Sequence, residues 1–313
     1  MIVTTCPPFP VSTRIFKEME KLRISKHIVD ESYHPLGFST YLDSEVYILG
    51  GWWPSAESLV DALRRKGMRV WLLWTPTLLQ SEILGSEILY LPKIKHLLED
   101  GSIEYVLCGS RDVAEYFGKR AKVIKHPLTP REIPQVEVMK RHIGLFGPTL
   151  PSKILNTYPR NILHQLLAFK DTANVIHTGP ISEEYKDFAA SIGVELIEHP
   201  WLPENEFYKL IASMEFGIQC SIPDIEGFSY TVFDFLQMDR PIFSTVDWIW
   251  EGLRLGTRHN EIRGLIRPAI PMSLPWMEGG YLRTFAEQLA ERHNTSFRAT
   301  IDELLEMSKI TVL

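Results

Sequence analysis

The sequence predicts an α/β protein built from two tandem Rossmann-like domains with parallel sheets facing a central cleft. Short apolar runs, typical of buried strands, alternate with stretches of helical periodicity along most of the 313 residues. A proline-containing stretch interrupts this alternation near the middle of the chain. The length also fits two domains of about 150 residues, each large enough to bury its own core.

The first domain is predicted over residues 1–130. The run 55–68 has apolar residues at helical spacing and a glycine near its end, so it indicates a helix between two strands. Strands separated by helices of this length form βαβ units, which give a parallel sheet. The predicted strands cover residues 2–6, 45–51, 69–75, 103–110 and 122–127.

The alternation restarts after a predicted linker at residues 131–141. The second domain is predicted over 142–285, followed by a helical tail over 286–313. Open α/β sheets bind ligands at the carboxyl ends of their strands, so the cleft between two such domains is the expected site. The predicted strands are 143–147, 174–179, 194–200, 216–222 and 241–245, and the helices include 161–169, 183–193 and 205–214.

Composition excludes several classes of protein. No apolar run approaches the roughly 18 residues of a membrane span, and the N-terminus lacks a secretion signal, so a cytoplasmic protein is expected. Cys6, Cys108 and Cys220 are too far apart to suggest a disulfide framework or a thiolate zinc site. The histidines show no metal-binding spacing, and His126 and His199, each before a proline, are interpreted as structural. No metal site is expected.

The net charge of the chain and its distribution indicate which binding partners to expect. The chain has a formal net charge of −6, and residues 1–140 carry 18 Lys/Arg against 17 Asp/Glu, so nucleic acid is not expected as a partner. The basic segment 12–26 has Ile15, Phe16, Met19 and Leu22 on one face. It could rest on an anionic membrane that carries a lipid-linked acceptor, or pack on the first sheet as an ordinary helix.

The segment 216–245 carries the most informative motif. Gly227 allows the backbone to approach a ligand closely, and the free N–H groups of the helix that follows suit a phosphate. Glu226 and Asp234 can accept hydrogen bonds from ribose or sugar hydroxyls. They could instead be a solvated loop acid and a helix acid favoured by the helix dipole.

This motif resembles the signature of the GT-B-fold, retaining glycosyltransferases of the large family that includes sucrose synthases and bacterial lipid mannosyltransferases (glycosyltransferase group 1). That signature is a strand, Ser-x-x-x-Glu-Gly-Phe-Gly, and a second carboxylate eight residues after the first. Here SIPDIEGFSYTVFD runs from Ser221 to Asp234 with one extra loop residue. The resemblance extends through IGLFGPTLPSK (143–153), NVIHTGP (174–180) and the run 193–218. The first domain matches mainly in architecture.

The resemblance implies a metal-independent hexosyltransferase that moves a sugar from a nucleotide-diphosphate sugar to an acceptor with retention of configuration. It implies no cofactor beyond this donor substrate. Lys153 would neutralise the leaving diphosphate, and Asp234 would hold the ribose. The implied catalytic residues are Glu226 and Lys153, and the implied donor-binding residues are Gly147, Lys153, Trp201, Leu202, Glu226, Gly227, Phe228, Ser229 and Asp234.

Three positions depart from the family pattern. Asp234 replaces a glutamate, Ser229 replaces a glycine, and Pro148 and Thr149 stand where an arginine usually follows the glycine of the first strand. These departures leave two alternatives open, a non-catalytic nucleotide-sugar-binding relative and a GT-B-fold nucleotide-sugar epimerase. DNA glucosylation is conceivable for the fold, but the acidic balance of the chain argues against it.

The acceptor, whether saccharide, lipid or protein, is not identified by the sequence. Gly50, Gly51 and Trp52 follow a predicted strand, so they are candidates for the acceptor side, with Trp52 or Trp53 stacking on a sugar. Trp71 and Trp74 lie in predicted strands and are interpreted as core residues.

Overall fold

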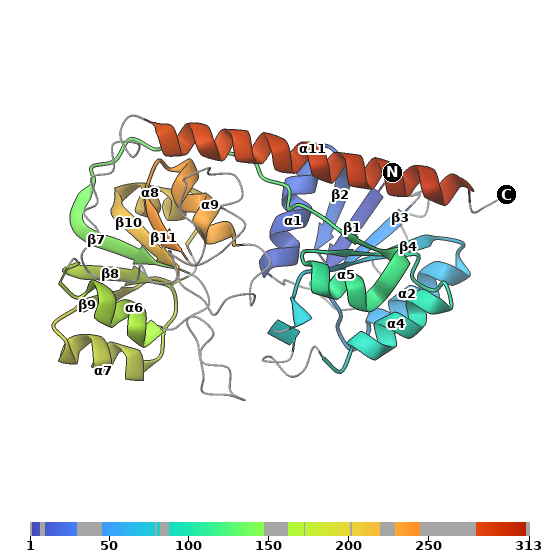
Figure 1. The fold of residues 1–313 in the computed structure, drawn as a ribbon, viewed down its shortest axis with the longest axis horizontal. Helices are drawn as coiled ribbons and strands as arrows, with labels where there is room; N and C mark the ends of the chain where they lie inside the picture. Colours follow the sequence, from blue (N-terminus) through green and yellow to red (C-terminus); the bar gives the residue numbers. More distant parts are fainter. Residues whose placement is uncertain are drawn as a thin grey trace. The chain divides into compact units, whose positions relative to one another are not determined.

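The computed structural model describes residues 2–6, 10–29, 46–78, 80–81, 88–146, 162–171, 173–200, 202–219, 229–244 and 280–310 (Figure 1). The chain forms two compact units, one of Met1–Thr129 with Ala290–Leu313 and the other of Pro130–Leu289. Each unit contains one parallel sheet with helices packed on it. The predicted fold class, α/β with two Rossmann-like domains, is confirmed.

The sheet of the first unit has the strand order β2-β1-β3-β4-β5-β6, and all neighbours are parallel. The prediction missed β2, because it assigned residues 12–26 to one helix. That helix ends at Lys21, and Arg23, with a φ of 58°, lies in the turn that leads into β2. The strands are β1 (Ile2–Cys6), β2 (Ser25–Val29), β3 (Val46–Gly50), β4 (Arg69–Trp74), β5 (Tyr105–Cys108) and β6 (Ala121–Val123).

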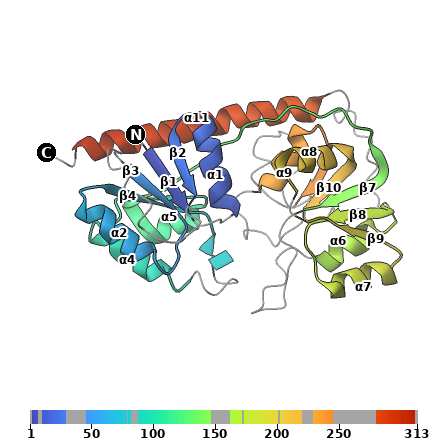
Figure 2. The ribbon, with the colours of Figure 1, turned by 180° about the vertical axis from the view of Figure 1, so that it is seen from behind.

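Helices pack on both faces of this sheet (Figures 1 and 2). Helix α2 buries residues 56, 59, 60 and 63, the spacing of one helical face, in a core shared with Tyr47 and Leu49 of β3. Side chains alternate along a strand, so Gly50 faces the opposite side, where it meets Phe16 of α1. The helices are α1 (Pro10–Lys21), α2 (Ala56–Arg65), α4 (Leu91–Glu99), α5 (Arg111–Phe117) and the short η2 (Gly118–Arg120).

The membrane alternative for α1 is not supported by this packing. Ile15, Phe16 and Met19 are buried in the first unit, so the apolar face of the helix is already covered by protein. No helix in the described part of the chain is both long and apolar enough to span a bilayer.

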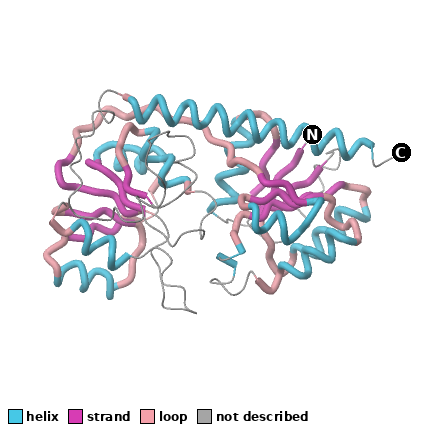
Figure 3. The backbone as a smooth tube through the Cα atoms, viewed as in Figure 1, coloured by secondary structure: helices cyan, strands magenta, loops and turns pink. Residues whose placement is uncertain are grey.

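The sheet of the second unit has the order β11-β10-β7-β8-β9, again with parallel neighbours. Strand β7 begins at Met139, so the last three residues of the predicted linker 131–141 belong to the sheet. In Figure 3 the strands of each sheet, in magenta, lie between helices, in cyan. The strands are β7 (Met139–Leu145), β8 (Val175–Thr178), β9 (Glu195–Glu198), β10 (Met214–Gln219) and β11 (Ile242–Ser244).

In the described part of the second unit, four helices cover the sheet, two on each face. One core joins Ile143 and Ile176 of the strands to the first pair of helices, and a separate core lies under the second pair. The first pair is α6 (Ile162–Phe169) and α7 (Glu183–Ser191), and the second pair is α8 (Glu204–Ser213) and α9 (Tyr230–Gln237).

Two glycines allow α9 to approach the sheet closely. Gly144 of β7 and Gly217 of β10 are register partners, and the Phe235 ring of α9 lies over both. A Cβ atom on Gly217 would be 2.7 Å from ring carbons of Phe235, and one on Gly144 would be 2.6 Å from the same ring. An aromatic ring can pack this close to two strands only where both lack side chains.

The substitution Gly217→Ala should therefore destabilise the second unit. We expect a loss of about 1–3 kcal/mol in the free energy of unfolding, the usual cost of overpacking a core. Urea denaturation of wild type, Gly217→Ala, Phe235→Leu and the double variant measures it. The double variant should lose less stability than the sum of the single variants, because the smaller side chain leaves room for the new methyl group. If the stability losses of the two single variants add up to that of the double variant, residue 217 and the Phe235 ring are not in close contact.

Helix α11 (Tyr281–Ile310) contributes to both units, with residues from Ala290 onward belonging to the first. The predicted tail from 286 is therefore part of a longer helix that packs as part of a unit. Asn294 bonds both polar groups of Leu128, with its Oδ1 accepting from the backbone N–H at 2.9 Å and its Nδ2 donating to the carbonyl at 2.7 Å. His293 Nδ1 lies 3.0 Å from the carbonyl oxygen of His126.

Acid should weaken the first unit through these two histidines. Burial lowers the pKa of His126 to about 3 and that of His293 to about 4. The unfolded chain takes up these protons as the pH falls through about 6.5, whereas the folded chain does not, so the free energy of unfolding should fall between about pH 6.5 and 4. Each histidine contributes up to about 1.4 kcal/mol per pH unit.

Urea unfolding at several pH values, followed by tryptophan fluorescence, measures this slope. His293→Gln should flatten it, and substitution of the exposed His96 by Gln serves as the control. If the free energy of unfolding falls with pH equally steeply in wild type and His293→Gln, the acid sensitivity does not come from His293.

Candidate functional site

The strand order of the second sheet locates its expected ligand site. From β7 the chain passes to β8 and β9 on one side, whereas β10 is followed by β11 on the other side. The connections that leave β7 and β10 therefore run in opposite directions from neighbouring strands. Such a switch point, at the carboxyl ends of the strands, is where open α/β sheets bind ligands.

The two connections at this switch point hold most of the residues singled out from the sequence. Residues 147–161 follow the β7 region and include Gly147 and Lys153, and residues 220–228 follow β10. The positions predicted there lie outside the described residues, as does Trp201 after β9: these are Gly147, Lys153, Trp201, Glu226, Gly227 and Phe228.

Ser229 and Gln219 border the switch point on the described side. Ser229 Oγ donates to Gln219 Oε1 at 2.6 Å, and both side chains are buried. This bond joins the residue before α9 to the last residue of β10. The Ser229 side chain makes no cap on α9, since its hydroxyl donates to Gln219.

Asp234 lies in the interior between α8 and α9. It is 1% exposed, and its Oδ1 accepts from Tyr208 Oη at 3.1 Å and from Gln237 Nε2 at 2.9 Å. Gln237 Oε1 in turn accepts from the backbone N–H of Arg131 at 2.8 Å. Asp234 thus joins the two helices of this face, and its contact with a ribose stays a prediction.

Three histidines form a hydrogen-bonded ladder across β7, β8 and the end of β9, which the sequence analysis missed. His142 Nδ1 lies 2.9 Å from His177 Nε2, and His177 Nδ1 lies 2.8 Å from His199 Nε2. The rings of His177 and His199 stack with centroids 5.1 Å apart. Burial, with a smaller effect from the neighbouring rings, lowers the pKa of His177 to about 4. The sequence signal that could have indicated the ladder is one histidine in or directly after each of three successive strands.

Leu202 lies half-buried in the connection from β9 to α8, three residues after His199. Leu202, which is predicted to lie near the nucleotide base, and His199 of the ladder are thus in the same connection. No group of three or more His, Cys, Asp or Glu residues is arranged to hold a metal ion within the described ranges.

Packing and backbone geometry account for the predicted acceptor-side residues of the first unit. The close contacts of Gly50 are with Phe16, Cys6 and Ser12, so the glycine is explained by packing rather than by a ligand. Gly51 has a φ of 85°, a conformation that favours glycine, and its N–H continues the β3–β4 ladder by donating to the Leu73 carbonyl at 2.8 Å. Trp52 is 6% exposed and belongs to the hydrophobic core, so it is not available to stack on a sugar.

The other tryptophans of this unit are also core residues. Trp53, Trp71 and Trp74 are all buried, which confirms the packing role predicted for Trp71 and Trp74. Trp53, the alternative candidate for stacking on a sugar, is buried like Trp52.

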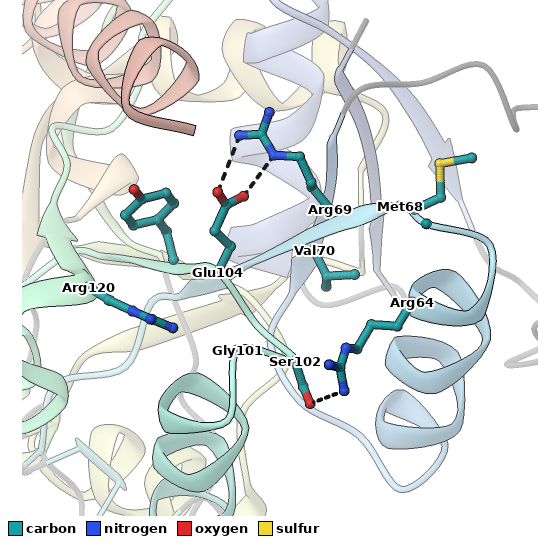
Figure 4. Close-up of a pocket in the computed structure, with 10 residues that line it drawn as sticks. Arg64, Met68, Arg69, Val70, Gly101, Ser102, Glu104 and Arg120 are labelled. Carbon is teal, nitrogen blue, oxygen red and sulfur yellow. Dashed lines mark hydrogen bonds and ion pairs between the residues drawn. The ribbon is translucent and has the colours of Figure 1, made fainter. Parts of the chain in front are cut away.

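The described residues also line a pocket of 420 Å³ at the opposite, amino-terminal edge of the first sheet (Figure 4). Three arginines in it make contacts within the protein. Arg69 Nε pairs with Glu104 at 2.9 Å, Arg64 donates to Ser102 Oγ at 2.7 Å, and Arg120 donates to the Leu98 carbonyl at 2.8 Å. Helices α2 and α4 end at this edge, and cations are favourable at helix C-termini. These arginines are therefore accounted for by the fold.

Comparison with solved structures identifies the architecture. The Anabaena protein HepE, solved with UDP and glucose, aligns over 100% of both chains with 13% identity and a TM-score of 0.58. An α-glucosyltransferase in complex with UDP-glucose and DNA aligns over 97% of this chain and 99% of its own, with 9% identity and a TM-score of 0.61. AviGT4, a glycosyltransferase of avilamycin A biosynthesis, aligns over 98% of both chains with 13% identity and a TM-score of 0.57.

The chain has the GT-B fold. Its two units are the two Rossmann-like domains of that fold, and the similarity extends over nearly the whole chain. No protein-family model matches the sequence, and no curated protein matches it either. At these identities the comparisons establish the fold, and the activity rests on the residues of the site.

The network around Asp234 predicts a large loss of stability for Asp234→Ala. The substitution removes the acceptor of two donors in a buried region, so we expect a loss of about 2–3 kcal/mol. Asp234→Asn should cost less, because its side-chain carbonyl can still accept. Substitution of the exposed Asp187 by Ala is the matched control and should change stability by less than about 0.5 kcal/mol. Equal effects of Asp234→Ala and Asp187→Ala in urea denaturation would contradict this role.

Proposed function

We propose that this protein is a glycosyltransferase that moves a sugar from a nucleotide-diphosphate sugar to an acceptor, with retention of configuration and without a metal ion. The observation that carries the proposal is the switch point between β7 and β10. The two segments that resemble the donor-site motifs of the family, one with Lys153 and one with Glu226, are the connections that follow these two strands. Sequence motif and sheet topology thus point to the same edge.

The diphosphate would lie at the start of α9. Helix N-termini bind phosphates through free N–H groups and the helix dipole, and Ser229 does not use these groups for a side-chain cap. In the proposed reaction Lys153 adds a fixed positive charge where negative charge develops as the diphosphate leaves. By the family resemblance, Glu226 and the backbone of residues 227–229 would bind the donor sugar and the distal phosphate.

The nucleoside would lie toward the connection from β9 to α8. Trp201 and Leu202 are proposed near the base, and Asp234 near the ribose. Through its bond with Tyr208, Asp234 also links α9 to α8, so it supports both the nucleoside side and the phosphate side of the proposed site. Rate acceleration would come mainly from positioning and from stabilisation of the leaving group.

The solved structures support the donor class in this proposal. HepE was solved with UDP and glucose, and the DNA-bound α-glucosyltransferase with UDP-glucose. Both share the fold of this chain over nearly its whole length. The acceptor is left open.

Calorimetric titration of UDP, GDP and ADP, with and without EDTA, tests the donor site. We expect one of the three to bind regardless of chelator, and Lys153→Ala to weaken it by about 10- to 100-fold, the effect of losing one charged hydrogen bond. Substitution of the exposed Lys170 by Ala is the control and should leave binding unchanged. Absence of binding by all three nucleotides, or binding abolished by EDTA, would contradict the proposal.

Product analysis with the corresponding sugar conjugate separates the alternatives. Transfer to an acceptor with the anomeric configuration kept, observed by NMR, supports the retaining glycosyltransferase. An epimerised donor formed without acceptor indicates an epimerase. Tight binding without transfer, hydrolysis or epimerisation on an acceptor panel indicates a non-catalytic relative.

A further inference from the structure

The histidine ladder of His142, His177 and His199 lies on the α8/α9 face of the second sheet. Ile143 and Ile176, the strand neighbours of two of these residues, face the core under α6 and α7, so alternation places the ladder residues on the other face. His177 is 5% exposed, and its two ring nitrogens face His142 and His199. Each bond needs one proton between its two nitrogens.

The number of protons that the ladder can hold follows from this geometry. A neutral imidazole carries one N–H and a cation carries two. With one proton in each ring-to-ring bond, only the outer nitrogens, His142 Nε2 and His199 Nδ1, can take more. Three neutral rings fill both bonds and one outer nitrogen, and one further proton fills the second outer nitrogen. A second further proton would put two N–H groups face to face and break one bond.

Among the described residues, the charged side chains near the ladder are exposed or form ion pairs of their own. Glu195 of β9 shares its face by alternation and is exposed. In β7, Met139 packs in the core under α8 and α9 and Arg141 has a φ of 63°, so Lys140 points to the opposite face. Glu198, next to His199, pairs with Lys186 of α7 at 2.7 Å. At the start of α8, Glu204 pairs with Arg131 at 2.7 Å and Glu206 with Lys209 at 2.9 Å. The two causes that lower the pKa of His177 are its burial and the other two rings.

The ladder holds the beginning of the connection from β9 to α8. The backbone N–H of His199 donates to the Thr178 carbonyl at 2.8 Å, and its ring bonds to and stacks on His177. Leu202 follows three residues later, and α8 with Tyr208 follows directly. Loss of the bond between His177 and His199 would free one of these attachments.

We propose that the ladder is a one-proton clamp on the connection from β9 to α8. Both ring-to-ring bonds stay intact with zero or one added proton, and a second added proton breaks one of them. The clamp thereby makes nucleotide binding sensitive to acid. His177 is a positioning residue in this scheme and does not touch the nucleotide. The part that concerns nucleotide binding rests on the proposed function, whereas the clamp itself does not.

Two NMR measurements test the clamp without any nucleotide. In a ¹⁵N titration of the imidazole rings, the ladder should take up one proton in a single shared step, and His177 should stay neutral until a lower pH. Three independent one-proton titrations would overturn the proposal. In hydrogen exchange, His177→Phe keeps a ring of similar shape without nitrogens and should lower the protection of the His199 amide by about five- to tenfold. Unchanged protection would also overturn it.

Nucleotide affinity as a function of pH tests the consequence. For wild type, the affinity of the nucleoside diphosphate that binds should stay level through the shared step and fall when the second proton enters. His177→Phe should bind several-fold more weakly at neutral pH and lose that acid step, which a purely structural role would not remove. The exposed His164 is the matched control, since His164→Gln should keep the wild-type profile.

The outcomes separate the clamp from the function. If no nucleotide binds to wild type, the proposed function and the binding consequence fail, while the NMR results still decide the clamp. If nucleotide binds and the profiles of wild type and His177→Phe are parallel, the clamp does not act on the site and this inference is wrong.

Discussion

The contact of Phe235 with Gly144 and Gly217 sets the geometry on which the proposed site depends. An aromatic ring packed directly on the backbone of two neighbouring strands holds α9 close to the sheet at the β7/β10 switch point. The start of α9 is therefore fixed relative to the carboxyl ends of the same strands. A helix start can bind an anion reproducibly only where packing fixes its position.

Buried polar groups next to this contact reinforce the position of α9. Asp234 faces α8 and accepts from Tyr208 and Gln237, so the helix is held by an apolar ring toward the sheet and by a carboxylate toward its neighbour. Ser229 adds a bond to Gln219 at the helix start. Two of the positions that depart from the family pattern, Ser229 and Asp234, thus have defined structural partners in this chain.

Histidines serve in both units as buried, neutral hydrogen-bonding groups. In the first unit His293 attaches α11 to the segment that carries His126 and Leu128. In the second unit the ladder joins three neighbouring strands side by side. Burial lowers the pKa of His126 and His293 in the first unit and of His177 in the second, which ties the integrity of both units to pH.

The α/β fold class, most strands and the segment that resembles the donor-site motif could be predicted from the residues alone, because alternating periodicity and a contiguous motif are local properties of the chain. The strand β2 was missed because its apolar pattern is short and follows directly on a helix. Only the tertiary structure decided that Trp52 is a core residue, that Asp234 bonds to Tyr208, and that His142, His177 and His199 form one ladder. These properties depend on which side chains of separate elements meet, and strand order and register, rather than local sequence, bring them together.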